Sequence, residues 1–171
     1  MEGSQPSNLK HDVTYTDLRE YIEKVDHLGE LRRIDGASWE EDIGLATELL
    51  QHSETAPCAL FDEIPGYPKG YRVFTNFFGG QRQNITLGFP AHLNKFELST
   101  AFNNAFKEII QNPVPYEVVD SGPVMENVME GDDVNVLSFP TPLWHSEDGG
   151  RYIGTGSFNV TRDPVEDWIN V

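Results

Sequence analysis

The sequence has 171 residues, enough for one domain and part of a second, and its 38% hydrophobic and 11% aromatic content is typical of a globular protein. Its 28 acidic residues against 12 basic ones give a net charge of −16, which would repel nucleic acid and an anionic membrane surface. No apolar run approaches the ~18 residues of a membrane-spanning helix. The first residues lack the basic and apolar regions of a signal peptide, and the single cysteine excludes an internal disulfide framework. We therefore expect a cytoplasmic protein.

Residues 1–13 are expected to form a disordered tail. A helix is predicted next, with Thr14 or Thr16 as its N-cap and Gly29 as a left-handed C-cap. Its apolar positions recur at helical spacing: Leu18, Tyr21, Ile22, Val25 and Leu28. The alternating segment Glu30–Ile34 predicts a short strand.

A second helix is predicted over Trp39–Leu50. Its apolar residues are expected to face the core: Ile43, Leu45, Ala46, Leu49 and Leu50. The apolar run Cys58–Phe61 predicts a buried strand and makes Cys58 a buried, unreactive thiol.

Tyr71–Asn76 predicts a further strand, followed by a flexible Gly79-Gly80 pair and a third helix within Phe89–Ile110. The alternation of helices and strands predicts an α/β domain over residues 14–112. Asn112-Pro113-Val114-Pro115 breaks the pattern, and we place the domain boundary there.

Residues 113–171 hold no convincing helix, and eleven acids against Arg151 and Arg162 give them a net charge of −9. Strands are predicted at Val118-Val119, Val134–Leu137 and Tyr152–Thr161. The segment is interpreted as the first strands of a β domain.

Few residues point to chemistry by themselves. His145 lies beside two acids and could be a base or a metal ligand, although a loop histidine satisfied by its neighbours is the simpler interpretation. Asp163–Asn170 offers oxygen ligands for a hard cation, but a polar hairpin turn explains it as well. The glycines near residue 150 match no phosphate-binding motif. No active site stands out on these grounds.

The order of several short motifs changes this picture. They are Asp17–Ile22, Gly29–Ile34, Leu60–Gly66, Pro140-x-Pro142, His145, Asp148–Ile153, Thr155-Gly156, Thr161–Pro164 and Trp168–Val171. Together they resemble the UbiD family of decarboxylases from about residue 16 to the last residue.

The resemblance implies a parent enzyme that uses prenylated FMN, with Mn²⁺ and K⁺ at the cofactor phosphate, to remove or add CO₂ on aromatic or α,β-unsaturated acids. It implies an N-terminal α/β domain followed by a split β-barrel that binds the flavin and a C-terminal domain for association, so the parent is expected to be a homo-oligomer. Residues 113–171 would then begin an incomplete barrel.

By position in the family pattern, Asn170 corresponds to a side-chain ligand of the divalent metal and Trp168 to a backbone carbonyl ligand of K⁺. Thr155 corresponds to the strand that lines the cofactor pocket. The family's catalytic arginine and glutamates correspond to positions beyond residue 171, so we expect a truncated or proteolysed form that is catalytically silent by itself.

Two other classes remain open. An acidic, non-catalytic interaction module could be completed by a partner chain, because strands without neighbours invite pairing. A flavin reductase on a related barrel is weaker, since nothing in the sequence indicates a nicotinamide site.

Overall fold

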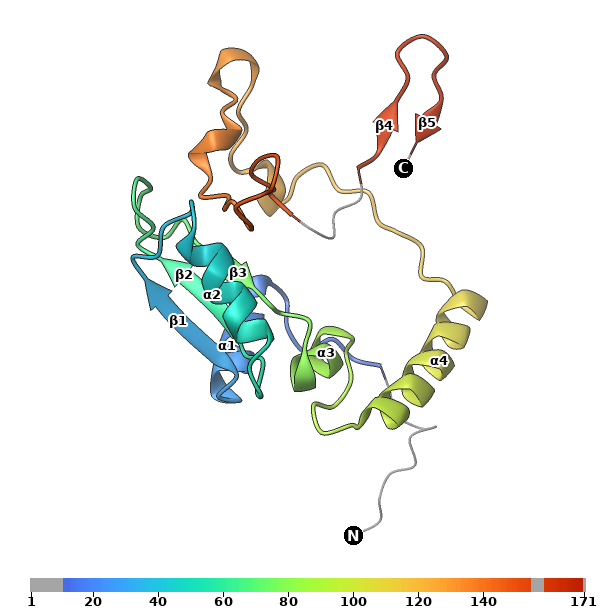
Figure 1. Ribbon diagram of the computed structural model, residues 1–171. Helices are drawn as coiled ribbons and strands as arrows, with labels where there is room; N and C mark the ends of the chain where they lie inside the picture. The colour runs from blue at the N-terminus through green and yellow to red at the C-terminus, as the bar shows by residue number, and fades with distance from the viewer. Residues whose placement is uncertain (1–10, 155–158, 171) are drawn as a thin grey trace.

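The computed structural model describes residues 11–154 and 159–170, and its centre is a three-stranded mixed sheet (Figure 1). Strand β1 (Leu31–Asp35) pairs in parallel with β2 (Cys58–Asp62), which pairs antiparallel with β3 (Val73–Thr75). The order is β1-β2-β3, and Leu31 lies opposite Cys58.

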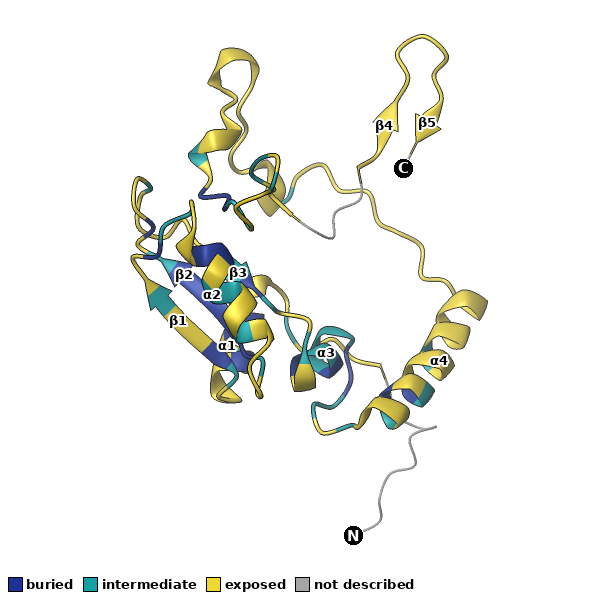
Figure 2. Ribbon diagram, in the orientation of Figure 1, coloured by how far each residue is buried: buried dark blue, intermediate teal, exposed yellow. Residues whose placement is uncertain are grey.

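Both faces of the sheet are covered by helices. Cys58 and Leu60 pack in one cluster with α1 (Leu18–His27), whereas Ala59 and Phe61 pack in another with α2 (Asp42–Gln51). Because side chains alternate along a strand, burial on both faces requires a continuous apolar run, as β2 has. The α/β character predicted for this part of the chain is confirmed, and Figure 2 shows the burial concentrated here.

The first helix starts later than predicted. Its N-cap is Asp17, not Thr14 or Thr16: the Asp17 carboxylate accepts hydrogen bonds from the backbone N–H groups of Arg19 and Glu20 at 2.8 and 2.9 Å. A carboxylate satisfies two free N–H groups and also suits the positive end of the helix. Gly29 follows the helix with φ +73°, as predicted.

The second helix begins at Asp42, and the predicted inward face was only partly right. Ile43 is fully buried, but Leu45 and Leu49 are 60% and 65% exposed. Residues four apart share a side of a helix, and this pair lies on the side opposite Ile43. Trp39 packs into the same cluster from the preceding loop.

The region around Gly79-Gly80 is not a flexible link but the start of a helix, α3 (Gly80–Thr86). The next helix, α4 (Lys95–Gln111), begins after Phe89 because Asn94 forms a capping box with Glu97. Phe89, Leu98 and Ala101 form a small cluster of their own. The remaining large apolar residues of α4 are exposed: Phe96, Phe102, Phe106, Ile109 and Ile110.

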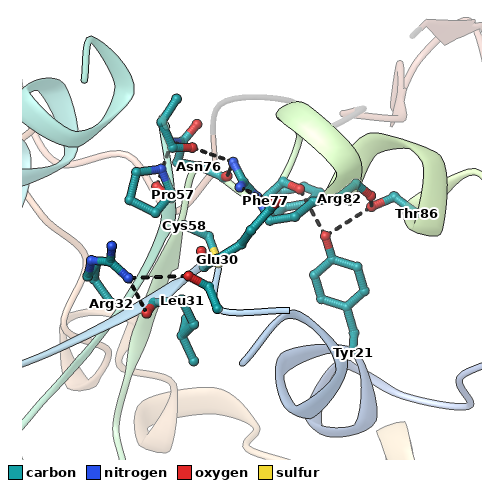
Figure 3. A network of polar contacts seen from close by, with 12 residues as sticks. Tyr21, Glu30, Leu31, Arg32, Pro57, Cys58, Asn76, Phe77, Arg82 and Thr86 are labelled. Carbon is teal, nitrogen blue, oxygen red and sulfur yellow. Dashed lines mark hydrogen bonds and ion pairs between the residues drawn. The ribbon is translucent and has the colours of Figure 1, made fainter. Parts of the chain in front are cut away.

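A buried arginine links α3 to the sheet (Figure 3). The Arg82 side chain is fully buried and forms an ion pair with Glu30 at 2.5 Å. It also donates to the backbone oxygens of Ala56 at 2.5 Å and Asn76 at 3.2 Å.

Nearby, the Tyr21 hydroxyl donates to the Phe77 carbonyl and accepts from Thr86. These bonds satisfy backbone groups where the chain leaves the sheet.

The strands predicted at Val118-Val119 and Val134–Leu137 are wrong. The structure has no regular secondary structure at the first position. Short 3-10 helices follow: η2 (Pro123–Met125), η3 (Gly131–Asp133) and η4 (Val136–Ser138). Prolines, glycines and acids limit sheet pairing here.

The strand predicted over Tyr152–Thr161 is also not found at Tyr152–Gly154, and residues 155–158 lie outside the described part. A two-stranded antiparallel hairpin, β4 (Thr161–Arg162) and β5 (Ile169–Asn170), ends the described chain. The domain boundary at residue 113 stays a prediction. Among the described residues, no helix combines the length and apolarity needed to cross a membrane.

Candidate functional site

The β4–β5 hairpin carries two of the three predicted site residues, and Asp163 shapes its turn. One carboxylate oxygen of Asp163 accepts from the backbone N–H groups of Val165 and Glu166 at 2.8 and 2.7 Å. Both bonds lower the pKa of Asp163, and the bond from the Glu166 N–H has the larger effect. Arg162 pairs with Asp167 at 3.0 Å across the same turn. The acids of this segment therefore build a polar hairpin turn, the simpler of the two interpretations.

Asn170 and Trp168 lie close together on the hairpin but do not by themselves enclose a cation. Asn170 is exposed and lies opposite Thr161 in the strand pair. The Trp168 carbonyl accepts a hydrogen bond from the Asp163 N–H at 2.8 Å, so one of its two lone pairs is already used. Among the described residues, no three His, Cys, Asp or Glu side chains are grouped for metal binding. The metal-ligand assignments stay predictions.

The third predicted residue, Thr155, lies outside the described residues. Its neighbour Gly154 lines a cleft of about 980 Å³ between the α/β layers and the segment that follows residue 143. One wall comes from α2 and the end of β3, including Thr47, Glu48 and Thr75, and the other includes Trp144 and Tyr152. The Thr47 and Thr75 hydroxyls are hydrogen-bonded at 3.1 Å.

His145 lies at the mouth of this cleft with 65% of its side chain exposed. Its backbone N–H donates to Asp148 at 2.9 Å, and its Nδ1 is 3.6 Å from the same carboxylate. Its Nε2 is 3.9 Å from Glu48 of α2. Both ring contacts are longer than a hydrogen bond, so the arrangement is that of an exposed loop histidine beside two acids.

Sequence reasoning missed Glu48 and Thr47. They lie about a hundred residues from His145 along the chain and carry no motif, and only the folding of residues 139–154 back onto α2 brings them together.

Two family models match the chain in succession. The 3-octaprenyl-4-hydroxybenzoate carboxy-lyase N-terminal domain matches residues 22–100, and the Rift-related domain of the same carboxy-lyase matches residues 117–171. Together they cover most of the chain.

Characterised relatives and solved structures agree with these models. The chain is 29% identical over 162 residues to the pyrrole-2-carboxylic acid decarboxylase of Pseudomonas aeruginosa, covering 89% of this chain and 32% of that protein. It is 32% identical over 157 residues to a phenolic acid decarboxylase of Sedimentibacter hydroxybenzoicus, covering 88% of this chain and 31% of that protein.

The structure resembles the closed form of the vanillic acid decarboxylase of Sedimentibacter hydroxybenzoicus, with a TM-score of 0.75, 30% identity, and coverage of 88% of this chain and 32% of that chain. The open form of that enzyme gives a TM-score of 0.64 over 80% of this chain and 30% of that one, at 29% identity. The chain thus spans about a third of the length of the relatives it matches. By its two successive domains and its relatives, this chain belongs to the UbiD family of decarboxylases and corresponds to its N-terminal portion.

Proposed function

We propose that this chain forms the N-terminal part of a reversible decarboxylase that acts on aromatic or α,β-unsaturated carboxylic acids with prenylated FMN. The observation that carries the proposal is the succession of the two carboxy-lyase domains on one chain. The decarboxylases named for pyrrole-2-carboxylic and phenolic acids match it over nearly nine-tenths of its length and support the substrate class. The 171 residues by themselves are expected to be catalytically silent.

When bound, prenylated FMN supplies the electron-accepting ring system for loss of CO₂. The Asn170 amide oxygen and the Trp168 carbonyl would contribute to holding Mn²⁺ and K⁺ at its phosphate, and Thr155 would line its pocket. Neutral oxygens suit hard cations and do not repel a phosphate. The hairpin would provide two strands of the split barrel. The described residues fit the group only in part, because the other cation ligands must come from elsewhere.

A chimera tests the proposal directly. The matching segment of the Pseudomonas aeruginosa decarboxylase is replaced by this chain, folding is checked by circular dichroism, and CO₂ release from pyrrole-2-carboxylate is measured. We expect CO₂ release that depends on prenylated FMN. A folded, flavin-loaded chimera without turnover would contradict the proposal.

Metal binding provides a second readout on the same chimera. Asn170→Ala is expected to weaken Mn²⁺ binding by at least about tenfold. Electron paramagnetic resonance measures the Mn²⁺ affinity. Asn104→Ala is the matched control, because Asn104 is an exposed amide on α4. Equal Mn²⁺ affinity in both variants would remove Asn170 from the site.

The expected silence of the chain by itself is tested with the purified 171-residue protein, prenylated FMN, Mn²⁺ and K⁺. Any CO₂ release above that of a blank without protein would overturn this part of the proposal.

A second candidate is a non-catalytic acidic module completed by a partner chain. It is favoured by the apolar side of α4, where Phe96 is 82% exposed and Ile110 63%. The molar mass of the free chain in solution discriminates, because a clean monomer argues against obligate pairing.

A further inference from the structure

Arg151 lies at the contact between the chain's second region and the α/β layers. Its Nε donates to the Thr141 carbonyl at 2.6 Å, and its Nη2 donates to the Tyr67 hydroxyl at 2.6 Å and the Phe139 carbonyl at 3.1 Å. Its Cζ lies 4.0 Å from the centre of the Trp39 ring. One side chain thus satisfies two carbonyls of its own segment while stacking on an indole of the other region.

A second contact brings the same segment against α2. The Leu143 N–H donates to the Trp39 carbonyl at 2.9 Å. Gly44 of α2 leaves so little room that a Cβ at this position would overlap the Trp144 carbonyl oxygen. The backbones touch here only because residue 44 has no side chain.

Among the described residues from 112 onward, full burial is confined to this contact. Residues 140–142 are buried, whereas nearly all residues from 112 to 139 are exposed (Figure 2). Closing such a long exposed loop costs entropy, so the contacts at its end must offset that cost.

We propose that residues 139–151, here termed the strap, fasten the Rift-related region to the N-terminal domain, and that Arg151 is the positioning residue of this joint. The strap lies within the match at 117–171, while Trp39, Gly44 and Tyr67 lie within the match at 22–100. Arg151 precedes Thr155 by four residues, so the joint would also limit how far the predicted cofactor-pocket residue can lie from the α/β layers. This last point rests on the proposed function, whereas the joint itself does not.

Arginine is required because a lysine ammonium cannot both stack flat on the Trp39 ring and reach two carbonyls and a hydroxyl in one plane. Glycine is required at position 44 for space alone. The two residues therefore provide independent tests of one joint.

The first test uses Gly44→Ala in the 171-residue chain, followed by amide hydrogen exchange. Alanine is the better helix former, so an α2 without the strap would become more stable. With the strap docked, the added Cβ displaces Trp144, and exchange at the Leu143 amide rises at least about tenfold while the β2 amides keep their protection.

The control is Gly122→Ala, because a Cβ at Gly122 meets nothing within 4 Å. It should leave exchange at Leu143 unchanged. Unchanged protection of Leu143 in Gly44→Ala would overturn the proposal.

The second test compares Arg151→Met and Arg151→Lys in a background where Trp144 and Trp168 are phenylalanine, so that only Trp39 emits. Arg151→Met is expected to shift Trp39 emission to the red and to raise Leu143 exchange at least about tenfold. Arg151→Lys should restore less than half of the lost protection. If Trp39 emission and Leu143 amide exchange are both unchanged in Arg151→Met, the proposed role of Arg151 in this joint is wrong.

Neither test needs flavin or substrate, so failure of the joint is distinguishable from failure of the proposed function. The decarboxylase chimera adds the positioning readout: Arg151→Met is expected to lower kcat at least about tenfold with little change in KM. A chimera inactive even with Arg151 would count against the proposed function alone, and an unchanged kcat in Arg151→Met would count against positioning alone.

Discussion

Single buried polar side chains decide much of this structure. Arg82 carries a full charge into the core, where Glu30 and two backbone oxygens balance it. Its Nε is the one buried side-chain nitrogen or oxygen without a hydrogen-bond partner in residues 11–154 and 159–170. Such a group stabilises the fold only while its partners stay in place.

Removing this charge should be costly. Arg82→Ala leaves Glu30 without its counter-charge and takes one donor from each of the Ala56 and Asn76 carbonyl oxygens, so the free energy of unfolding should fall by about 3 kcal/mol or more. Urea denaturation measures the loss. Arg33→Ala, which removes the exposed pair with Asp26, is the control and should leave the midpoint nearly unchanged. Similar losses in the two variants would contradict a special role for burial.

The buried thiol makes stability depend on alkaline pH. Burial raises the pKa of Cys58 above its usual value of 9.0, and burial likewise raises the pKa of Tyr21 above 10.0. Above pH 9 the unfolded chain loses protons that the folded chain keeps, so the free energy of unfolding should decrease as pH rises. Thermal unfolding between pH 8 and about pH 11 measures this slope.

Cys58→Ala should unfold more easily at every pH but with a shallower slope, because the Cys58 contribution is lost while that of Tyr21 remains. An identical slope in the variant would exclude Cys58 as a source of the effect.

At the scale of elements, α4 depends on its own ends more than on packing. It has only two buried residues, Leu98 and Ala101, both in its N-terminal half. Its capping box at Asn94 satisfies the backbone N–H groups of Phe96 and Glu97, which have no partner within the helix.

Loss of this cap should loosen the helix. Asn94→Ala is expected to cost about 1 kcal/mol of local stability and to speed amide exchange in the first turn of α4. Asn103→Ala is the matched control, since alanine at this exposed mid-helix position should slow exchange slightly. Equal amide exchange rates in the first turn of α4 in both variants would contradict a stabilising role for the Asn94 cap.

At the scale of the whole molecule, two regions are joined twice: covalently through an exposed connection and non-covalently through the strap. Residues 112–121 are exposed and form neither helix nor strand, and Tyr116 is 90% exposed. The strap then returns the chain to the α/β layers at Arg151 and Trp39.

Limited proteolysis should separate these two connections. Chymotrypsin is expected to cut first at Tyr116, because exposed chain without hydrogen-bonded structure is cleaved most readily. The two fragments should nevertheless elute together in gel filtration at neutral pH. In Arg151→Met they should elute apart, and separate elution from the unmodified chain would show that the strap is too weak to hold them.

The local sequence was sufficient to predict the elements whose structure depends on residues close together in the chain. The continuous apolar run at Cys58–Phe61 predicts a strand buried on both faces. Gly29 ends the first helix because glycine adopts the left-handed backbone there without steric cost. The ordered motifs predict the UbiD family, which the two domain matches bear out. Such features depend on neighbours along the chain and are visible in the sequence.

Tertiary structure decided what depends on distant partners. Nothing near Arg82 in the sequence shows that Glu30 will balance it, and nothing near Leu45 shows that no element will cover it. The strands expected at Val118-Val119 and Val134–Leu137 are absent from the described chain, since apolar pairs become strands only where another strand completes their hydrogen bonds. The strap likewise exists because Gly44 and Trp144, a hundred residues apart, meet in space. Sequence determined the family and the central strand, and long-range contact determined which side chains act together.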